Sequence, residues 1–562
     1  MTASSAFPPA LVLILGGLLL PLLRGYARGI AALALPLLTM WLVWQLPDGV
    51  SLSARFLEYR LELVEADALG RLFAIIFAIM AFAGALFALN QPRVAELAAG
   101  SVSAGCAIGI ALAGDLITLF VFWEVMAVAS IVIVWSRGTE ESYRASMRYL
   151  QIHLLGGVLL MAGIVAQVAD TGTIAFTAMT PGTPGTWLIL AGFLINAGAP
   201  PLSVWLPDAY PEASYSGTVF LSAFTTKAAV YVLLRGFPGV EVLIYVGLYM
   251  MLYGIIYALL ENDMRRILAY SIVNQVGFMV TGIGIGTEMA LNGAAAHAFT
   301  HIIYKALLLM SAGSVLYMTG KRKCSDLGGL FQSMPITTLC GIVGALSISS
   351  FPLTSGFISK SMISQGAADE RLLIPWFLLA AGSAGVFLHA GIKFPWFVFF
   401  QKDSGLRPPD PPLNMRLAMV LFSILCIGLG IWPEPLYALL PYPVEYAPYS
   451  VPHVVNMLQL LLFSGLAFFI MLPLMERTLT ITLDIDWFYR TVGKRVFGGA
   501  ATLTSNLLRG FETAVRYWVG ALIAFTFRQA GPQGVLARTG AVGSMVTWVV
   551  VLLGVYLLLY FV

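Results

Sequence analysis

The sequence has 562 residues, of which 59% are hydrophobic and 10% are charged, and its formal net charge is +3. Soluble globular domains carry about 25% charged residues, so this composition excludes a string of soluble domains and predicts a polytopic membrane protein. No nucleotide-binding glycine loop stands in a convincing context, and nothing in the sequence indicates binding to nucleic acid.

Apolar segments bounded by charges, prolines or glycines predict about sixteen membrane spans. The first begins near Phe7 and has no basic n-region and no A-x-A cleavage site before Arg24, so we interpret it as a spanning helix rather than a signal peptide. The expected spans are 7–23, 29–46, 71–90, 95–114, 115–135, 148–168, 187–207, 217–236, 240–260, 264–286, 289–318, 336–366, 373–400, 414–433, 454–475 and 541–562.

The arginines and lysines between these spans indicate a topology, because cytoplasmic loops are enriched in both residues. With the N-terminus outside, most of them fall on the inner side, and both termini are then expected outside. The outer side holds only Arg55, Arg60, Arg71, Arg235 and Arg371. Three lysines fit neither side because they fall within spans, namely Lys227, Lys305 and Lys360.

Two spans contain prolines that interrupt a helix, within residues 196–214 and 349–360. Backbone groups at such breaks must be surrounded by protein or water, and paired breaks in two halves of a chain are typical of transporter repeats. Residues 153–163 resemble 301–313, and residues 200–203 resemble 351–354. These pairs lie an odd number of spans apart, which predicts inverted repeats; chance similarity between apolar segments is the alternative.

Glu124 lies in the apolar segment 115–135. A carboxyl group there is either neutral and hydrogen-bonded to a neighbouring helix or a proton site beside a lysine. Lys227 lies near the middle of its span, about two turns from Arg235, so its side chain does not easily reach the membrane surface. Both residues are therefore candidates for carrying protons.

The segment 289–318 carries His297, His301 and Lys305 at positions i, i+4 and i+8, which lie on one stripe of a helix. A charged group at the centre of a bilayer costs about 2.5–3.5 kcal/mol even on insertion scales, so a titratable stripe indicates function. Lys360, after the second break, and His389 extend this polar line toward the inner surface. The line predicts a pathway for protons.

Residues 484–533 carry apolar side chains at spacings of three and four on one face and mostly basic side chains on the other. This pattern predicts an amphipathic helix along the cytoplasmic membrane surface before the last span. The alternative is two short surface helices that are broken at Gly498 and Gly499.

The four cysteines are scattered, with no CxxC pair and no metal-ligand spacing, so they are expected to be small apolar fillers. No cofactor and no metal site is expected. The predicted parts are N-terminal transmembrane helices at 1–94, a first repeat at 95–236, a second, inverted repeat at 237–400, additional transmembrane helices at 401–483, an amphipathic lateral segment at 484–540 and a final transmembrane helix at 541–562.

Several specific motifs stand within the first four hundred residues: GDLITLFVFWE, WLPDAYPEAS, SAFTTKAAVY, HAFTHIIYKALLLMSAGSV and PLTSGFISK. Together they resemble the antiporter-like subunits shared by Mrp-type sodium/proton antiporters and respiratory complex I, and within that superfamily the D-type subunits of Mrp antiporters. The segment that begins DIDWFYR, with one last span after it, also resembles the lateral helix of the largest complex I antiporter-like subunit. The resemblance implies an all-α fold of two inverted five-helix repeats, two broken helices and a chain of buried charges, in which Glu124, Lys227, Lys305 and Lys360 match charged positions.

One position departs from the family pattern. Counting back from WLPD, the lysine that the family places on the first broken helix falls on Asn196, which cannot carry a charge. The resemblance therefore implies that Glu124 lacks its usual ion pair. Glu124 then turns to Lys227, to His153 or to a charge on a neighbouring subunit, or this half-channel works differently or is inactive.

These patterns and the resemblance predict a proton-translocating subunit of a multi-subunit monovalent cation/proton antiporter in a bacterial inner membrane. Its expected partners are other membrane subunits, protons, sodium or potassium ions and the lipid bilayer. One alternative is a proton-pumping subunit of a complex I-like NADH:quinone oxidoreductase or a membrane hydrogenase, and another is a membrane scaffold for a soluble partner. The chain has no redox-centre motif, so it is expected to be an ion transporter rather than an enzyme. The expected proton-carrying residues are Glu124, Lys227, His297, His301, Lys305, Lys360 and His389.

Overall fold

The structure is a computed structural model that describes residues 7–474, 484, 487–538 and 540–561. The chain divides into two compact units, Met1–Asp484 and Ile485–Val562, and each is described by itself. Among the described residues, thirteen helices are long and apolar enough to cross a membrane, and three shorter apolar helices stand at other expected spans. The composition thus correctly predicted a multi-pass helical membrane protein, whereas the count of about sixteen spans stays a prediction.

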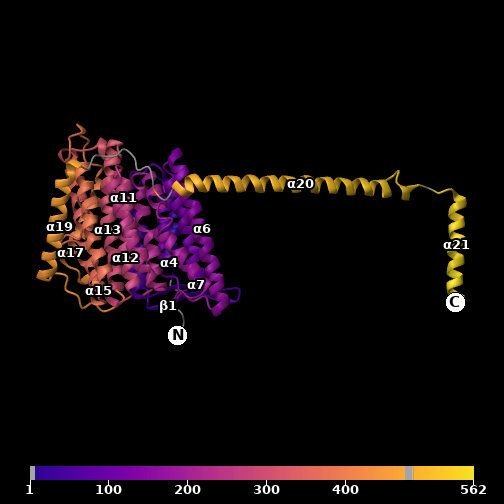
Figure 1. Ribbon diagram of the computed structural model, residues 1–562, viewed down its shortest axis with the longest axis horizontal. Helices are drawn as coiled ribbons and strands as arrows, with labels where there is room; N and C mark the ends of the chain where they lie inside the picture. The colour runs from indigo at the N-terminus through magenta and orange to yellow at the C-terminus, as the bar shows by residue number, and fades with distance from the viewer. Residues whose placement is uncertain (1–6, 475–483, 485–486, 539, 562) are drawn as a thin grey trace. The chain divides into compact units, whose positions relative to one another are not determined.

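The helices of the first unit stand side by side, with α6 near one edge and α19 near the other (Figure 1). They form because an apolar helix satisfies its own backbone hydrogen bonds, which lipid cannot do. The first of them are α1 (Pro9–Leu19), the 3-10 turn η1 (Leu20–Leu22), α2 (Gly25–Gln45), α3 (Ala68–Phe87), α4 (Val94–Ala111), α5 (Leu116–Trp135) and α6 (Glu140–Thr171).

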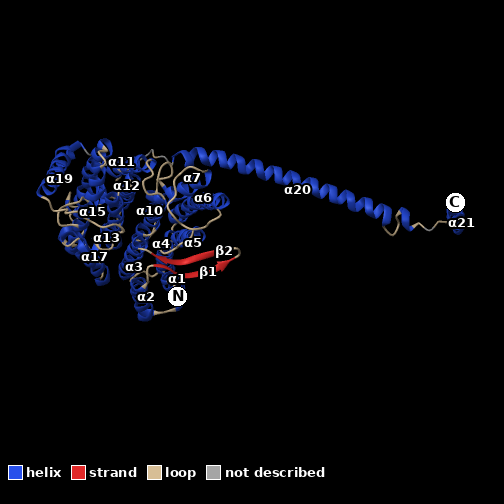
Figure 2. Ribbon diagram, turned by 90° about the horizontal axis from the view of Figure 1, so that it is seen from below, coloured by secondary structure: helices blue, strands red, loops and turns tan. Residues whose placement is uncertain are grey.

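A β-hairpin that was not predicted from the sequence lies at one end of the bundle, where Figure 1 labels β1, and Figure 2 draws both of its strands in red. Its strands β1 (Gly49–Phe56) and β2 (Tyr59–Ala66) pair antiparallel. Polar and apolar residues alternate in β2 around Leu61, but the segment lacks the Asn-Gly or Asp-Gly turn that usually identifies a hairpin. The backbone N–H of Glu62 donates to the carboxylate of Asp115 at 2.8 Å, which joins the strand to the start of α5. This end of the bundle is called the hairpin end below.

The first interruption lies after Ala197, as the prolines predict. The chain then forms short helices and one longer helix: α7 (Pro184–Ala197), α8 (Trp205–Ala209), η2 (Tyr210–Glu212), α9 (Gly217–Ala223) and α10 (Thr225–Gly236). A further irregularity at Phe224, between α9 and α10, was not predicted, and it lies three residues before Lys227.

The second interruption follows Ile348, again within the expected segment. A π-helix, η5, continues α16 and was not foreseen, because no sequence pattern identifies it. The elements are α11 (Val242–Leu260), α12 (Met264–Ile285), α13 (Glu288–Thr319), η3 (Cys324–Asp326), η4 (Leu330–Gln332), α14 (Pro335–Ile348), α15 (Ser355–Asp369), α16 (Leu373–Val386), η5 (Phe387–Lys393) and η6 (Trp396–Phe400).

The core of the first unit lies along α10, α12 and α13, because these helices have neighbours on all sides and bury even their polar residues. α17 and α19, by contrast, expose many large apolar side chains, as expected for helices that face lipid. The four cysteines are buried and unpaired, in agreement with the expected filler role. The last elements of this unit are α17 (Leu413–Ile431), α18 (Glu434–Tyr437), α19 (Val451–Met471) and η7 (Leu472–Leu474).

The second unit contains η8 (Phe488–Gly493), α20 (Lys494–Ala530), η9 (Val535–Ala537) and α21 (Val542–Phe561). α20 runs without a break through Gly498 and Gly499, so the alternative of two short helices is wrong. Each glycine makes the helix about 1 kcal/mol less stable than an alanine would, and this cost does not interrupt the 37-residue helix. Its apolar stripe is exposed along its length, as in Leu507 and Phe511.

Candidate functional site

The titratable stripe of α13 lies in the middle of the bundle. His297, His301 and Lys305 have no exposed surface. His297 hydrogen-bonds to Ser359 of α15 through Nδ1 at 3.1 Å and to Gln275 of α12 through Nε2 at 3.2 Å. Neither His301 nor Lys305 has a hydrogen-bond partner among the described residues. The stripe therefore contains one anchored histidine followed by a histidine and a lysine that no polar group holds.

The lysines at the helix interruptions bind backbone carbonyls. Lys227 donates to the carbonyl of Ser222 at 2.7 Å, and Lys360 donates to the carbonyl of Ile348 at 2.6 Å. An interrupted helix leaves carbonyl groups without intrahelical partners, and a lysine near the C-terminal end of a helix satisfies them. These two lysines therefore have a structural role that Lys305 lacks.

His389 and Lys393 lie on the π-helix η5, and both are buried. Nδ1 of His389 hydrogen-bonds to the carbonyl of Gly385 at 2.8 Å, and its Nε2 has no partner in the described part of the chain. Lys393 closes the C-terminal end of α11. It donates to the carbonyls of Ala258 at 3.1 Å, Leu259 at 2.5 Å and Glu261 at 2.6 Å. A π-turn inside a helix is frequent at functional sites, which fits the position of His389.

Glu124 lies on α5 and is half-buried. Its Oε1 has no hydrogen-bond partner, and among the described residues no lysine or arginine forms an ion pair with the carboxylate. Of the two alternatives for Glu124, neither an ion pair with a lysine nor a hydrogen bond at Oε1 is present among the described residues. The carboxylate lies instead against Gly157 of α6, where a Cβ atom would stand 2.2 Å from Oε1. A glycine at this position therefore makes the space that the carboxylate occupies.

Replacing Gly157 with alanine is expected to displace the Glu124 carboxylate, because the new methyl group would occupy its position. A displacement of about 1 Å at a reacting group can cost 100-fold in rate, so proton transport should fall by about tenfold or more. The matched control is Gly428→Ala in α17, where an added Cβ meets nothing within 4 Å. Proton flux in membrane vesicles measures both, and equal flux in the two variants would contradict the expected role of the carboxylate.

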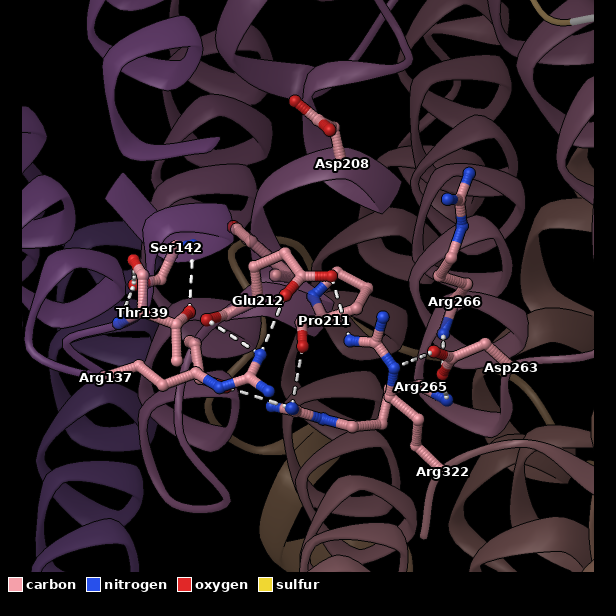
Figure 3. Close-up of polar contacts among 12 residues, drawn as sticks. Arg137, Thr139, Ser142, Asp208, Pro211, Glu212, Asp263, Arg265, Arg266 and Arg322 are labelled. Carbon is pink, nitrogen blue, oxygen red and sulfur yellow. Dashed lines mark hydrogen bonds and ion pairs between the residues drawn. The ribbon is translucent and has the colours of Figure 1, made fainter. Parts of the chain in front are cut away.

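Ion pairs join several helices at the end of the bundle opposite the hairpin, because α5 begins beside the hairpin and ends just before the paired Arg137. Figure 3 shows these pairs. Glu212 of η2 accepts from Arg137, after α5, at 2.7 Å and from Arg322, after α13, at 2.9 Å. Arg322 also pairs with Asp263, which caps α12, at 2.9 Å. Burial raises the pKa of Asp263, although Arg322 beside it favours the carboxylate. The chain of pairs fixes the loop after the first interruption to helices from both halves.

Asp208 shows the same arrangement within the first half. Arg148 of α6 donates to both of its carboxylate oxygens, at 2.6 and 2.9 Å. A bidentate pair of this kind is stronger and more directional than a single contact. Asp208 and Glu212 are therefore both ion-paired charges at this end of the bundle.

Arg265, at the start of α12, was missed from the sequence. It is buried, and its guanidinium donates to the carbonyls of Pro211 at 2.7 Å, Ala213 at 2.9 Å and Ser214 at 2.7 Å, and to the hydroxyl of Thr218. In the sequence, Arg265 stands beside Arg266 among the arginines expected at the inner membrane surface, so nothing in the sequence indicated that its side chain is buried. Gln275 was also missed, and a glutamine inside an apolar span is a signal that marks it.

The chain is similar in sequence to known membrane transport and respiratory proteins. Residues 113–388 match the family described as NADH:quinone oxidoreductase/Mrp antiporter, TM. The chain is 31% identical over 350 residues to the D subunit of the Na(+)/H(+) antiporter of Alkalihalophilus pseudofirmus, a match that covers 58% of this chain and 71% of that protein. It is 29% identical over 377 residues to NADH-quinone oxidoreductase subunit N of Desulforudis audaxviator, with 61% and 75% covered. It is also 27% identical over 448 residues to hydrogenase-4 component B of Escherichia coli, with 70% and 66% covered.

Two solved structures share the fold. A chain of the Mrp complex from Dietzia superposes with a TM-score of 0.69 at 20% identity, over 82% of this chain and all of that chain. A chain of the membrane-bound sulfane sulfur reductase, an archaeal respiratory membrane complex, superposes with a TM-score of 0.71 at 23% identity, over 98% of this chain and 99% of that one. The helical membrane architecture is therefore shared with both assemblies.

Proposed function

Because the chain belongs to the NADH:quinone oxidoreductase/Mrp antiporter transmembrane family, we propose that it is the proton-translocating subunit of a multi-subunit monovalent cation/proton antiporter. The similar proteins described above include a sodium/proton antiporter subunit, and a K(+)/H(+) antiporter subunit of Rhizobium meliloti is 30% identical over 355 residues. The transported cation is then sodium or potassium. Other membrane subunits complete the antiporter, since the family fold occurs within assemblies of several chains.

The observation that carries this proposal is the environment of Lys305. Its amine is fully buried and has no hydrogen-bond partner among the described residues. A buried polar group without a partner costs free energy, so it is retained for a reason other than stability. An amine that no carbonyl holds is free to take up and release a proton. His301, one turn away, is buried and unpartnered in the same way.

The proposed mechanism is electrostatic. Adding a proton to one member of the buried line raises the cost of a charge on the next, because like charges repel strongly where water is scarce. Protons then move stepwise along residues whose titrations are coupled. Water that enters at the helix interruptions completes the path to each surface. The line consists of Glu124, Lys227, His297, His301, Lys305, Lys360 and His389.

We further infer the organisation and location of the chain. Residues 95–236 and 237–400 form two inverted repeats, each with one interrupted helix, and residues 484–540 lie along the membrane surface before the final span at 541–562. The excess of lysine and arginine in alternate loops supports an orientation with both termini outside, and the bacterial relatives support a bacterial inner membrane location. The preceding helices, 1–94, and the helices of 401–483 flank the repeats.

A second candidate function is proton pumping within a redox-driven membrane complex. The observation that favours it is coverage: the likeness to the sulfane sulfur reductase chain extends over 98% of this chain, whereas the likeness to the Mrp chain covers 82%. Sequence relatives in a quinone oxidoreductase and a hydrogenase point the same way. In this case other subunits would supply the redox chemistry, and the same buried line would carry the protons.

Ion-flux measurements on vesicles that contain the chain with the products of its neighbouring genes separate the two candidates. A pH gradient is first established across everted vesicles, and sodium or potassium ions are then added. The antiporter proposal predicts that one of these cations collapses the gradient. A gradient that responds to neither cation, and is built up only when a redox substrate is supplied, would overturn it in favour of the second candidate.

A further inference from the structure

His153 is a buried histidine of α6 that the proposed proton line does not include. It is 2% exposed. Its ring stacks on Tyr149, with ring centroids 3.9 Å apart, and meets the edge of Trp205 at 4.7 Å. The ring faces the side chain of Asn196, yet neither ring nitrogen makes a hydrogen bond of ordinary geometry within the described chain. Burying such a ring unpaired costs free energy, so its packing alone does not explain it.

On one side, His153 lies one helical turn from the residue that contacts Glu124. Gly157, against which the Glu124 carboxylate lies, follows His153 by four residues on the same face of α6. Four residues rise about 6 Å along the helix axis, and a bridging water is able to join polar groups of α5 and α6 over one turn. Gly156, next to Gly157, packs against the side-chain oxygen of Asn196, with an added Cβ 3.5 Å away. α5, α6 and α7 thus bring a carboxyl, an imidazole and an amide together.

On the other side, hydroxyl groups lead from His153 toward Lys227. The Tyr149 hydroxyl, on the ring that stacks with His153, lies 3.4 Å from the hydroxyl of Thr225. Thr225 begins α10, two residues before Lys227. Lys227 itself donates to the hydroxyl of Thr226 at 3.1 Å. Each hydroxyl both donates and accepts, so a proton passes along this side once one water joins the imidazole to the Tyr149 hydroxyl and another joins Thr225 to the Lys227 amine.

We propose that His153 carries the proton between Glu124 and Lys227 in the first half of the chain, a role that rests on the proposed proton transport. The proton leaves the carboxyl group of Glu124 as an O–H bond breaks, and an N–H bond forms at the imidazole, which leaves a carboxylate and an imidazolium. The imidazolium then gives up one proton through the hydroxyls of Tyr149 and Thr225 and the bridging waters, each of which accepts one proton and releases one. The Lys227 amine ends as ammonium, and His153 returns to neutral.

Asn196, which His153 faces, explains why a histidine is needed at this place. No charge is available at Asn196, and its amide neither gives up nor takes on a proton under ordinary conditions. His153 faces that amide from the adjacent helix. The first half is therefore complete with a histidine on α6 in place of a charged residue on α7, and it is not an inactive half-channel.

The test replaces His153 with phenylalanine, which keeps the aromatic stack on Tyr149 and removes the proton-carrying nitrogens. General acid–base groups contribute about 100- to 10,000-fold to rate, so cation-dependent proton flux should fall by about 100-fold. Adding Asn196→Lys to this variant places an amine on α7 beside the former imidazole position and should restore flux by about tenfold. The control is His453→Phe, because His453 also stacks on an aromatic ring, Phe357, with ring centroids 4.5 Å apart, but belongs to α19 and not to the helices of the first half.

The outcomes separate this inference from the proposed function. Flux in His153→Phe within about twofold of wild type would overturn the inference and leave the antiporter proposal intact. A wild-type protein without cation-dependent proton flux would overturn the antiporter proposal itself. If His153→Phe does not insert into the membrane, His153→Gln and Tyr149→Phe replace it, and undiminished flux in both of these variants would equally overturn the inference.

Discussion

Arg265→Met is expected to destabilise the protein more than any other single change at the end opposite the hairpin. The substitution leaves the carbonyls of Pro211 and Ala213 buried without their donor, whereas the carbonyl of Ser214 still accepts from Thr218. Each unsatisfied buried group costs about 1–3 kcal/mol, so the loss should reach at least about 2 kcal/mol. The remaining folded fraction after heating of the detergent-purified protein measures this effect, alongside the yield of membrane-inserted protein.

Two control variants show whether the loss of stability comes from the buried guanidinium of Arg265. Arg144→Met removes an exposed arginine whose ion pair with Glu140 joins neighbouring turns of α6, and its loss should cost less than about 0.5 kcal/mol. Arg265→Lys keeps the charge but offers a single nitrogen, so its stability should fall between wild type and Arg265→Met. Equal heat resistance of Arg265→Met and Arg144→Met would contradict the structural role of the buried guanidinium.

Arg265 joins the two halves of the first unit. Arg265 begins α12, in the second half, and holds the loop that follows the first interruption. Glu212 in that loop is bound in turn by arginines that follow α5 and α13. A movement of the first interrupted helix must therefore be transmitted to, or resisted by, helices of the second half.

The sequence predicted the features that depend on local physics. Apolar segments long enough to span a bilayer became helices, and the prolines after Asn196 and Ser349 ended α7 and α14 close to the expected residues. The burial of Lys227, Lys305 and Lys360 followed from their positions within spans. These predictions succeed because length, hydropathy and helix-breaking residues act over a few neighbouring positions.

Features that depend on packing between helices were not predictable in the same way. The contact of Glu124 with Gly157, in place of a lysine, is set by how α5 and α6 meet. The carbonyl partners of Lys227 and Lys360 depend on where each interruption leaves a backbone group unpaired. The π-helix η5 around His389 has no sequence signature. The hairpin lacked a recognisable turn, although its second strand alternates polar and apolar residues.

Lys305→Ala is expected to abolish proton transport without loss of the folded protein. The amine of Lys305 has no hydrogen-bond partner among the described residues, so its removal leaves no polar group unsatisfied. Lys360→Ala would instead free the carbonyl of Ile348 and combine a structural with a functional effect. Lys305 is therefore the position at which a transport defect is separable from a folding defect.

The most direct test of the buried proton line is cation-driven proton flux in everted vesicles that carry Lys305→Ala, measured beside wild type and the exposed-lysine control Lys321→Ala. The amounts of inserted protein are matched in all three preparations. Lys321→Ala should transport like wild type, whereas Lys305→Ala should fall to the background of vesicles without the protein. Undiminished flux in Lys305→Ala would show that protons do not cross the membrane along this line.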